Sequence, residues 1–435
     1  MIIEQGASPA GGANDGARLP VGQEVAGATG AVGTSRKGAS TLGRSTILLF
    51  AVASGMAVAN AYFAHPLLDV MAKDLGLSHG FAGLIVGMTQ LGYGLGLVLL
   101  VPLGDLVDRR KLIVGQSILS VLALICVGVS TTAAMLLASM AAMGLLAVVT
   151  QALVAYASSL ALPSDRGHVV GMVTSGIVLG ILLARSVAGF LTDLSGWRTV
   201  YLVSALLTSV VALLLWRTLP RQARRRTSLS YTSLIRSLPT LLIEEPVLCI
   251  RGVIAMLIFA NITTLLTPLV LPLSAPPYSL SHTAIGLFGL AGAAGALGAT
   301  RAGRWADRGY GERTTGVALG LMLVAWLPIW LLDCSILWLV AGVIIIDFGL
   351  QATHVTNQAM IYRVRPDAQN RLTAAYMMFY SLGSAIGSST STIVYAHAGW
   401  TGVCITGAGI SIAAILWWAF TRRWIPAVAT RKVDA

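Results

Sequence analysis

Long apolar runs alternate with short polar breaks along almost the whole chain. A helical run of about 20 residues spans the roughly 30 Å hydrocarbon core of a bilayer. The strands of a membrane barrel would instead alternate apolar and polar positions, with a turn about every ten residues, and no such pattern occurs here. The pattern therefore predicts an all-α polytopic membrane protein with twelve transmembrane helices, near residues 46–70, 80–103, 112–130, 133–161, 169–192, 197–216, 247–272, 283–302, 314–332, 336–361, 372–395 and 400–420.

Composition and charge narrow this interpretation. Of 435 residues, 56% are hydrophobic and 11% are charged, whereas soluble domains carry about 25% charged residues. The net charge of +12 would suit nucleic acid, but the basic residues gather in every second break between the runs. The positive-inside rule then predicts an even number of spans with both termini in the cytoplasm. We expect basic loops that contact anionic lipid in a bacterial-type inner membrane, and no nucleic-acid partner.

The N-terminal segment and the cysteines indicate no catalytic or metal-binding role. Residues 1–44 are rich in Gly, Ala and Ser and have neither an apolar core nor a cleavage site, which predicts a disordered cytoplasmic tail. The four cysteines are scattered singly and form no CxxC pair. No metal site and no cofactor are therefore predicted.

Polar motifs recur about two hundred residues apart. The stretch GDLVDRR begins at Gly104, and GRWADRG begins at Gly303. Asn60 and Asn261 share nearly the same spacing. Such repeats are typical of secondary transporters, in which one half moves against the other around a central site. The predicted division is a tail at 1–44, a six-helix bundle at 45–217, a basic cytoplasmic linker at 218–246, a second six-helix bundle at 247–421 and a basic cytoplasmic tail at 422–435.

The pattern G-x-x-x-D-R at residues 104–109 resembles the signature loop of the major facilitator superfamily. The Gly-rich segment SGIVLGILLARSVAG at 175–189 resembles a motif of its drug/proton antiporter branch. Lys111 stands where a second glycine is usual, and the segment at 175–189 lacks the proline that commonly follows a motif glycine. The resemblance implies a twelve-helix major facilitator fold and a transporter rather than an enzyme.

The same resemblance gives the polar loop a role as a conformational latch. It implies that Asp108 and Arg109 form a charge relay with neighbouring helix ends, and that Gly104 permits close packing. The alternative is a cluster that only sets topology, although such a cluster needs no acids. The weaker counterpart in the second half would be Gly303, Asp307 and Arg308.

Asp347 is the only acid placed well inside a predicted helix. An ionisable group at that depth costs at least ~2.5–3.5 kcal/mol on insertion scales, so it indicates a function or a partner. Gln351, His354 and Gln358 follow it on the same helical face, which should line water or protein rather than lipid. The resemblance implies that this helix lines the central cavity.

Arg185 is the basic group best placed to reach Asp347. A carboxylate that alternates between an arginine and a proton is a plausible coupling device, and a static buried ion pair is the alternative. Ser388 occupies the aligned position in the second repeat, so the arginine is not a repeated architectural residue. His354 is a candidate proton relay because imidazole changes charge near neutral pH, or it is a neutral, hydrogen-bonded side chain.

Other polar side chains inside the apolar runs are candidates for a substrate cavity. The alternative for each is an interhelical hydrogen bond worth about 0.6 kcal/mol. His282 is assigned to a loop and given no role. The cavity candidates are Asn60, Tyr62, Gln90, Gln151, Asn261, Gln351, Gln358, Tyr376 and Tyr380.

These features predict a secondary transporter that moves a small organic molecule by alternating access, with proton-coupled export as the leading hypothesis. Proton-coupled uptake of a small metabolite is the alternative, and a transporter-like receptor without transport is a third possibility of a different class. The sequence has no nucleotide-binding motif, so a gradient must drive transport. The predicted partners are the substrate, protons and membrane lipid, and the protein is expected to function as a monomer.

Overall fold

The structure, a computed structural model, describes residues 43–162, 165–220, 231–364 and 369–423. All regular elements in these ranges are helical, which confirms the all-α prediction. Most of the predicted tails at 1–44 and 422–435 lies outside the described residues, and Arg44 begins the first helix.

The first repeat contains nine α-helices and two short 3₁₀ turns. Each of the six spans predicted here falls on one to three of these elements, so the hydrophobic pattern located them correctly. In chain order they are α1 (Arg44–Tyr62), η1 (His65–Leu67), α2 (Leu68–Asp74), η2 (His79–Phe81), α3 (Gly83–Leu99), α4 (Leu103–Leu106), α5 (Arg109–Gly128), α6 (Ala133–Ala147), α7 (Val149–Leu160), α8 (Arg166–Ser195) and α9 (Trp197–Thr218).

The second repeat follows the same order after a helix that the sequence analysis did not predict. That helix, α10 (Tyr231–Glu244), lies within the predicted linker. The final helix turns at Gly399, whose positive φ of 60° glycine tolerates, and it covers the last two predicted spans. The remaining elements are α11 (Pro246–Leu266), α12 (Val270–Ser274), α13 (His282–Trp305), η3 (Ala306–Tyr310), α14 (Gly311–Val324), α15 (Trp326–Trp330), η4 (Leu331–Asp333), α16 (Ile336–Val364) and α17 (Gln369–Thr421).

The length and apolar composition of these helices suit them to cross a membrane. Ten helical stretches within the described ranges are long and apolar enough to cross a bilayer, and α13 covers the span predicted at 283–302. Many large apolar side chains are exposed along them, as expected for surfaces that face lipid tails. The chain is therefore a multi-pass membrane protein.

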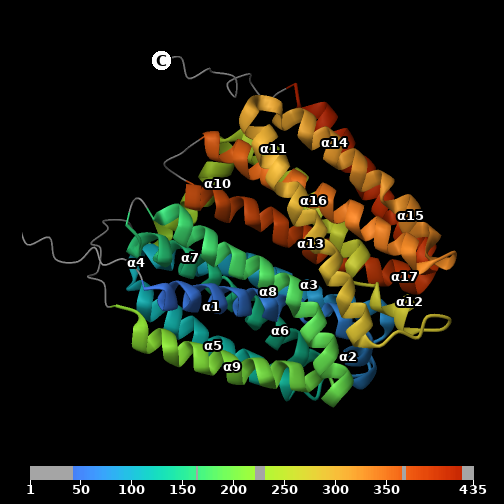
Figure 1. The fold of residues 1–435 in the computed structure, drawn as a ribbon, viewed down its shortest axis with the longest axis horizontal. Helices are drawn as coiled ribbons and strands as arrows, with labels where there is room; N and C mark the ends of the chain where they lie inside the picture. The colour runs from blue at the N-terminus through green and yellow to red at the C-terminus, as the bar shows by residue number, and fades with distance from the viewer. Residues whose placement is uncertain (1–42, 163–164, 221–230, 365–368, 424–435) are drawn as a thin grey trace, which may run out of the picture. The chain divides into compact units, whose positions relative to one another are not determined.

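Small residues allow the same close helix contact in both repeats. A Cβ atom added at Gly180 of α8 would meet the backbone of Gly55 in α1. In the second repeat, a Cβ at Gly383 of α17 would meet the backbone of Met256 in α11. Without a hydrophobic driving force between helices in lipid, such close backbone contact is a main source of packing energy. Figure 1 shows α1 beside α8 and α11 crossing close to α17.

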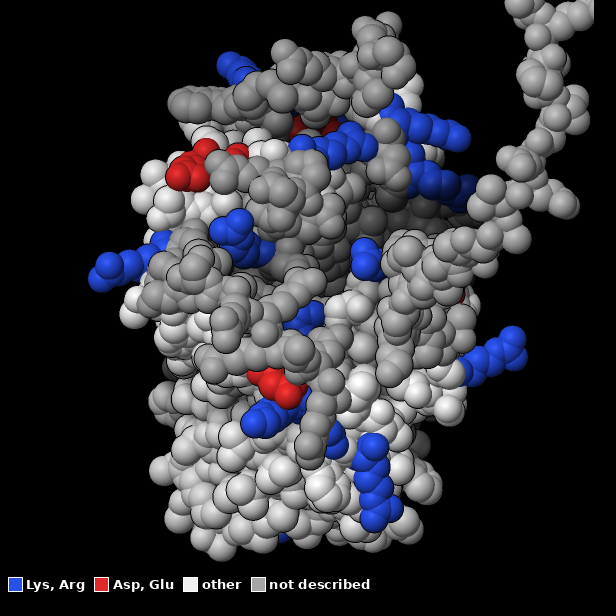
Figure 2. Space-filling model, turned by 90° about the vertical axis from the view of Figure 1, so that its left-hand side faces the viewer, with Lys and Arg blue, Asp and Glu red and all other residues white. Residues whose placement is uncertain are grey.

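The two ends of the helices differ in charge. Lys and Arg side chains gather on the face that Figure 2 presents, which is the side where α4, α7 and α10 end in Figure 1. We call this the basic end and the other the distal end. Among the described residues, the hydrogen bonds that join residues 45–217 to residues 247–421 lie from the middle of the helices toward the distal end. There Thr392 Oγ1 accepts from Gly83 N at 3.1 Å and donates to Gly80 O at 2.9 Å, and Ser186 donates to Gly286 O at 3.2 Å.

Candidate functional site

Two tyrosines from opposite repeats meet between α1 and α17. The Oη atoms of Tyr62 and Tyr380 lie 2.6 Å apart. The ring of Tyr380 packs edge-on against Phe259, with centroids 4.1 Å apart, and also faces Tyr93. Gln151 donates to Tyr93 Oη over 3.4 Å. The structure thus brings Tyr62, Tyr380 and Gln151 into one polar and aromatic group, to which Tyr93 and Phe259 contribute without having been predicted.

Asp347 and Arg185 face this group from α16 and α8. Asp347 is buried, with 9% of its surface exposed. The Arg185 guanidinium lies over the Tyr62 ring, 5.8 Å from the centroid, and its Nε has no hydrogen-bond partner. Asp347 and Arg185 are within electrostatic reach of each other, yet no ion pair joins them in the described structure. This geometry leaves the carboxylate free of its partner and differs from a closed ion pair.

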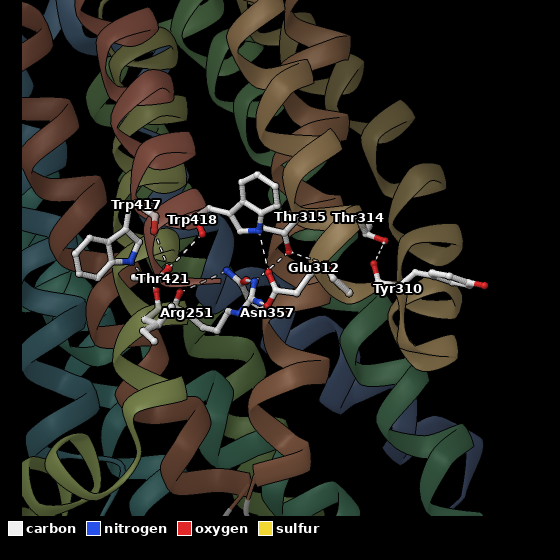
Figure 3. Close-up of polar contacts among 11 residues, drawn as sticks. Arg251, Tyr310, Glu312, Thr314, Thr315, Asn357, Trp417, Trp418 and Thr421 are labelled. Atoms are coloured by element: carbon white, nitrogen blue, oxygen red, sulfur yellow. Dashed lines mark hydrogen bonds and ion pairs between the residues drawn. The ribbon is translucent and has the colours of Figure 1, made fainter. Parts of the chain in front are cut away.

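Arg251, a residue that the sequence analysis did not assign to a site, anchors a polar cluster inside the second repeat. Its side chain is fully buried in α11 and donates to Glu312 at the start of α14. It also donates to Thr315 Oγ1 at 3.1 Å, while Trp418 Nε1 donates to the other Glu312 oxygen at 2.9 Å. Figure 3 shows these side chains converging from α11, α14, α16 and α17. We call Arg251, Glu312, Thr315, Asn357 and Trp418 the Arg251 cluster.

A chain of hydrogen bonds links the Arg251 cluster to His354. Arg251 Nη1 lies 3.4 Å from Asn357 Oδ1, and Asn357 Nδ2 lies 3.5 Å from Tyr376 Oη. Tyr376 Oη is 3.0 Å from His354 Nδ1. Because a guanidinium can only donate, Asn357 turns its oxygen to Arg251 and donates its amide hydrogen to Tyr376. Tyr376 Oη in turn shares a hydrogen bond with His354 Nδ1, whose direction depends on the tautomer of the imidazole.

The first repeat carries aromatic side chains where the second carries this cluster. By the spacing of the two repeated asparagines, Phe50 corresponds to Arg251 and Tyr156 to Asn357. Phe50 and Tyr156 are fully buried and pack edge to face, with ring centroids 6.0 Å apart. The two repeats therefore share helix packing but differ in chemistry at the same place.

The remaining cavity candidates have mixed surroundings. Asn60 is buried and accepts a hydrogen bond from Ser204 at 2.6 Å. Asn261 donates to Gly407 O and to Ser411 Oγ, each at 2.7 Å. Both asparagines thus tie helices of their own repeat together in this conformation. The other candidates are Gln90, which is buried beside Tyr380, and Gln351 and Gln358, which are half-buried on α16.

The polar loop before α5 connects to neighbouring helix ends of the first repeat. Arg109 donates to Gly104 O at 3.3 Å and to Ala155 O of α7 at 3.1 Å. Arg110 donates to the carbonyl of Trp216 near the end of α9. The Trp216 carbonyl lies in the last turn of α9, where the helix dipole is negative, so an arginine suits it. The basic side chains thus join this loop to two neighbouring helices of the repeat.

The other residues predicted to form the latch make local contacts or lie outside the described part of the structure. Asp108 caps α5 by accepting from the backbone of Arg110 at 2.9 Å. A Cβ at Gly104 would make ordinary contact with Leu112 at 3.7 Å, so packing in this conformation does not require a glycine there. Arg308 is exposed, and the surroundings of Gly303 and Asp307 lie outside the described part of the structure.

Metal chemistry has no support among the described residues. No group of three or more His, Cys, Asp or Glu side chains in that part of the chain could hold a metal ion. The polar side chains gathered here can form hydrogen bonds with an organic ligand.

Comparison with known proteins places the chain in a family. The sequence matches the Major Facilitator Superfamily over residues 47–301 and again over 252–433. It is 47% identical, over 87% of its length, to 96% of a putative uncharacterized transporter, YgaY, of Escherichia coli strain K12. It is 30% identical, over 86% of each chain, to a probable transporter, SCO4007, of Streptomyces coelicolor.

The fold agrees with a solved transporter. The crystal structure of a bacterial homolog of the human lysosomal transporter Spinster, in an inward-facing and occupied conformation, matches with a TM-score of 0.69 and 12% identity, covering 87% of this chain and 96% of the other. The protein therefore belongs to the major facilitator superfamily. It is a transporter rather than an enzyme, as the signature loop indicated.

Proposed function

We propose that this transporter exports a small organic molecule in exchange for protons by alternating access. The observation that carries the proposal is the buried Asp347 carboxylate, which lies within electrostatic reach of Arg185 from the other repeat without contacting it. A buried acid without a direct partner binds a proton more readily than one in a closed ion pair. Movement of the repeats that brings Arg185 onto Asp347 would then release that proton.

The surrounding side chains provide a surface for the substrate. Tyr62, Tyr380, Tyr93 and Phe259 present aromatic faces beside the carboxylate. His354, which the Arg251 cluster holds in place through Tyr376, adds a polar ring to this surface. Aromatic faces with a few positioned polar groups suit an organic molecule with both apolar and hydrogen-bonding parts.

We also propose that this conformation faces inward, with the two bundles in contact at the distal end. We propose that the two bundles, 45–217 and 247–421, are the units that move, and that 218–246 links them in the cytoplasm. Basic residues at one end of the helices support a cytoplasmic position of that end and of both termini. Hydrogen bonds between the bundles toward the distal end support closure on the external side.

A compound screen tests the direction of transport. Cells with and without the protein are exposed to a panel of labelled organic compounds, and accumulation is measured with and without a protonophore. Export predicts lower accumulation of at least one compound in cells that carry the protein, and the protonophore should abolish the difference. Higher accumulation in the cells that carry the protein would contradict export and favour proton-coupled uptake. Binding of a compound without any change in accumulation would favour a receptor.

A further inference from the structure

A second group of ionisable side chains lies at the distal end, away from Asp347. From the sequence, His282 is expected in a loop, but this residue is the first of α13. Its Nδ1 lies 2.9 Å from Asp193 Oδ1 at the end of α8. Its Nε2 lies 3.2 and 3.3 Å from the two oxygens of Asp69 in α2. We call Asp69, Asp193 and His282 the distal triad.

The distal triad joins the two repeats. Asp69 and Asp193 belong to the first repeat, and His282 to the second. Asp193 also accepts from the backbone of His282 at 3.1 Å, from the backbone of Thr283 at 2.8 Å and from Thr283 Oγ1 at 2.6 Å. Close packing surrounds these bonds, since a Cβ at Gly189 of α8 would meet the His282 backbone. The triad is therefore part of the contact that closes this end.

The hydrogen bonds of the triad require one proton more than its separated members hold at neutral pH. An ionised carboxylate only accepts, and a neutral imidazole has one donor and one acceptor nitrogen. Both ring nitrogens of His282 face carboxylate oxygens. Either the ring is an imidazolium that donates from both nitrogens, or one carboxyl group is protonated and donates to the ring. Each arrangement contains one added proton.

Within the described part of the chain, two carboxylates act on the His282 ring. Asp69 and Asp193 are the ionisable groups that act on it electrostatically. The packed segment α12 has no charged residue. In η1, His65 lies 3.3 Å from the carbonyl of Tyr62 and contacts neither carboxylate of the triad. The side chains of the triad retain 17–28% of their exposure, so protons from the adjoining solution can reach them.

We propose that the distal triad is a proton-binding site that takes up one proton when the distal ends of the two repeats close and releases it when they part. This inference rests on the proposed topology, in which the distal end is external. External acid then stabilises the closed, inward-facing state, and this stabilisation is lost as the external pH rises through the imidazole range. For a proton-coupled exporter, the site would favour the return to the inward-facing state when protons are abundant outside.

The separation of the distal ends is the quantity to measure. Thr131 on the first repeat and the native Cys334 on the second are exposed near this end. Spin labels at Thr131→Cys and at Cys334, with the other three cysteines replaced by serine, report their distance by pulsed electron paramagnetic resonance in lipid nanodiscs. No substrate is needed. Spectra are compared at about pH 5.5 and about pH 8, on either side of the usual imidazole pKa of about 6.5.

The proposal predicts a short distance at the lower pH and a several-fold rise in the ratio of open to closed molecules at the higher pH. His282→Gln should remove this response, whereas His282→Lys, which stays charged, should remain closed at both values. His397→Gln is the matched control, because His397 lies 2.8 Å from the carbonyl of Ile393 and contacts no carboxylate.

Two results would overturn the proposal. One is a doubly labelled protein with His282 intact whose distance distribution is the same at both pH values. The other is a His282→Gln protein that keeps the full response. If His282→Gln does not fold, two measurements still decide the question. These are the distances at both pH values in the labelled protein with His282 intact and in the His282→Lys variant. Failure of this test leaves the role of Asp347 untouched, because Asp347 is present in every variant.

Discussion

Arg251 and Glu312 form an ion pair at a place where the first repeat packs one aromatic ring against another. The arginine is fully buried, whereas the glutamate side chain keeps 33% of its exposure. The pair also holds Asn357, which leads through Tyr376 to His354. The second repeat thus carries a polar network from its basic end toward the proposed substrate site, and the corresponding position in the first repeat is aromatic.

Loss of the acid from this pair should cost more stability than loss of the base. Glu312→Leu leaves a buried guanidinium without its counter-charge, which costs ~3–5 kcal/mol. Arg251→Leu leaves a carboxylate that can still reach water, so its cost should be smaller. Thermal unfolding of both purified variants in the same detergent measures the difference. Equal losses, or a larger loss for Arg251→Leu, would show that the charges are not the source of the stability.

Replacing the polar side chains of the Arg251 cluster by those at the corresponding positions of the first repeat should keep the protein stable while removing the hydrogen-bond network. Ile113 corresponds to Glu312 by the spacing of the two polar loops, and it is fully buried. A protein with Arg251→Phe, Glu312→Ile and Asn357→Tyr should unfold near the wild-type temperature, because apolar replacement of a buried ion pair is often neutral or stabilising. It should nevertheless transport poorly, since Tyr376 loses its link to the pair. Wild-type transport by this stable protein would reduce the cluster to packing.

The loop before α5 offers a test that separates charge from capping. Asp108→Asn keeps a side-chain oxygen that can cap α5 but removes the negative charge. We expect transport to fall several-fold while thermal stability changes little. Asp108→Ala is the control, because it also loses the cap at a cost of about 1 kcal/mol. A fully active Asp108→Asn protein would leave the loop with a topological role alone.

Orientation can be read by labelling. Thr240 on α10 and Ser279 before α13 are both exposed, at opposite ends of the spans. In a cysteine-free protein, an impermeant thiol reagent added to intact cells should modify Ser279→Cys but not Thr240→Cys. Permeabilised cells, in which both should react, serve as the control. The reverse pattern in intact cells would invert the proposed topology.

Much of the fold follows from the sequence because bilayer thickness imposes a length on each apolar run. All twelve predicted spans correspond to helices, and the repeated signature loop correctly indicated the superfamily. Helix α10 was missed because its fourteen residues carry a polar side chain in nearly every turn and contain Pro239, which is unfavourable inside a helix.

The polar contacts were harder to predict because they depend on which helices meet. Asp347 stands out in its own segment, since a single acid among apolar residues needs a reason. Arg251 lies near a helix end, where a basic residue is ordinary, and its partner Glu312 lies beyond the next span. Comparison of the repeats offered a signal, because an arginine stands where the first repeat has Phe50. His282 gave no such signal, because both of its carboxylate partners are distant in the chain.

Proton flux in proteoliposomes tests most directly whether Asp347 couples transport to protons. With a compound identified by the accumulation screen, a pH gradient should drive uphill movement by the wild type. Asp347→Asn should abolish uphill movement and substrate-dependent proton flux yet retain downhill exchange, since the amide resembles the protonated acid. The same measurements are made on Arg185→Leu and on the double variant Arg185→Leu with Asp347→Leu. The account predicts no pH-driven accumulation by the double variant, whereas full accumulation by that protein would contradict it and leave the two residues a structural pair.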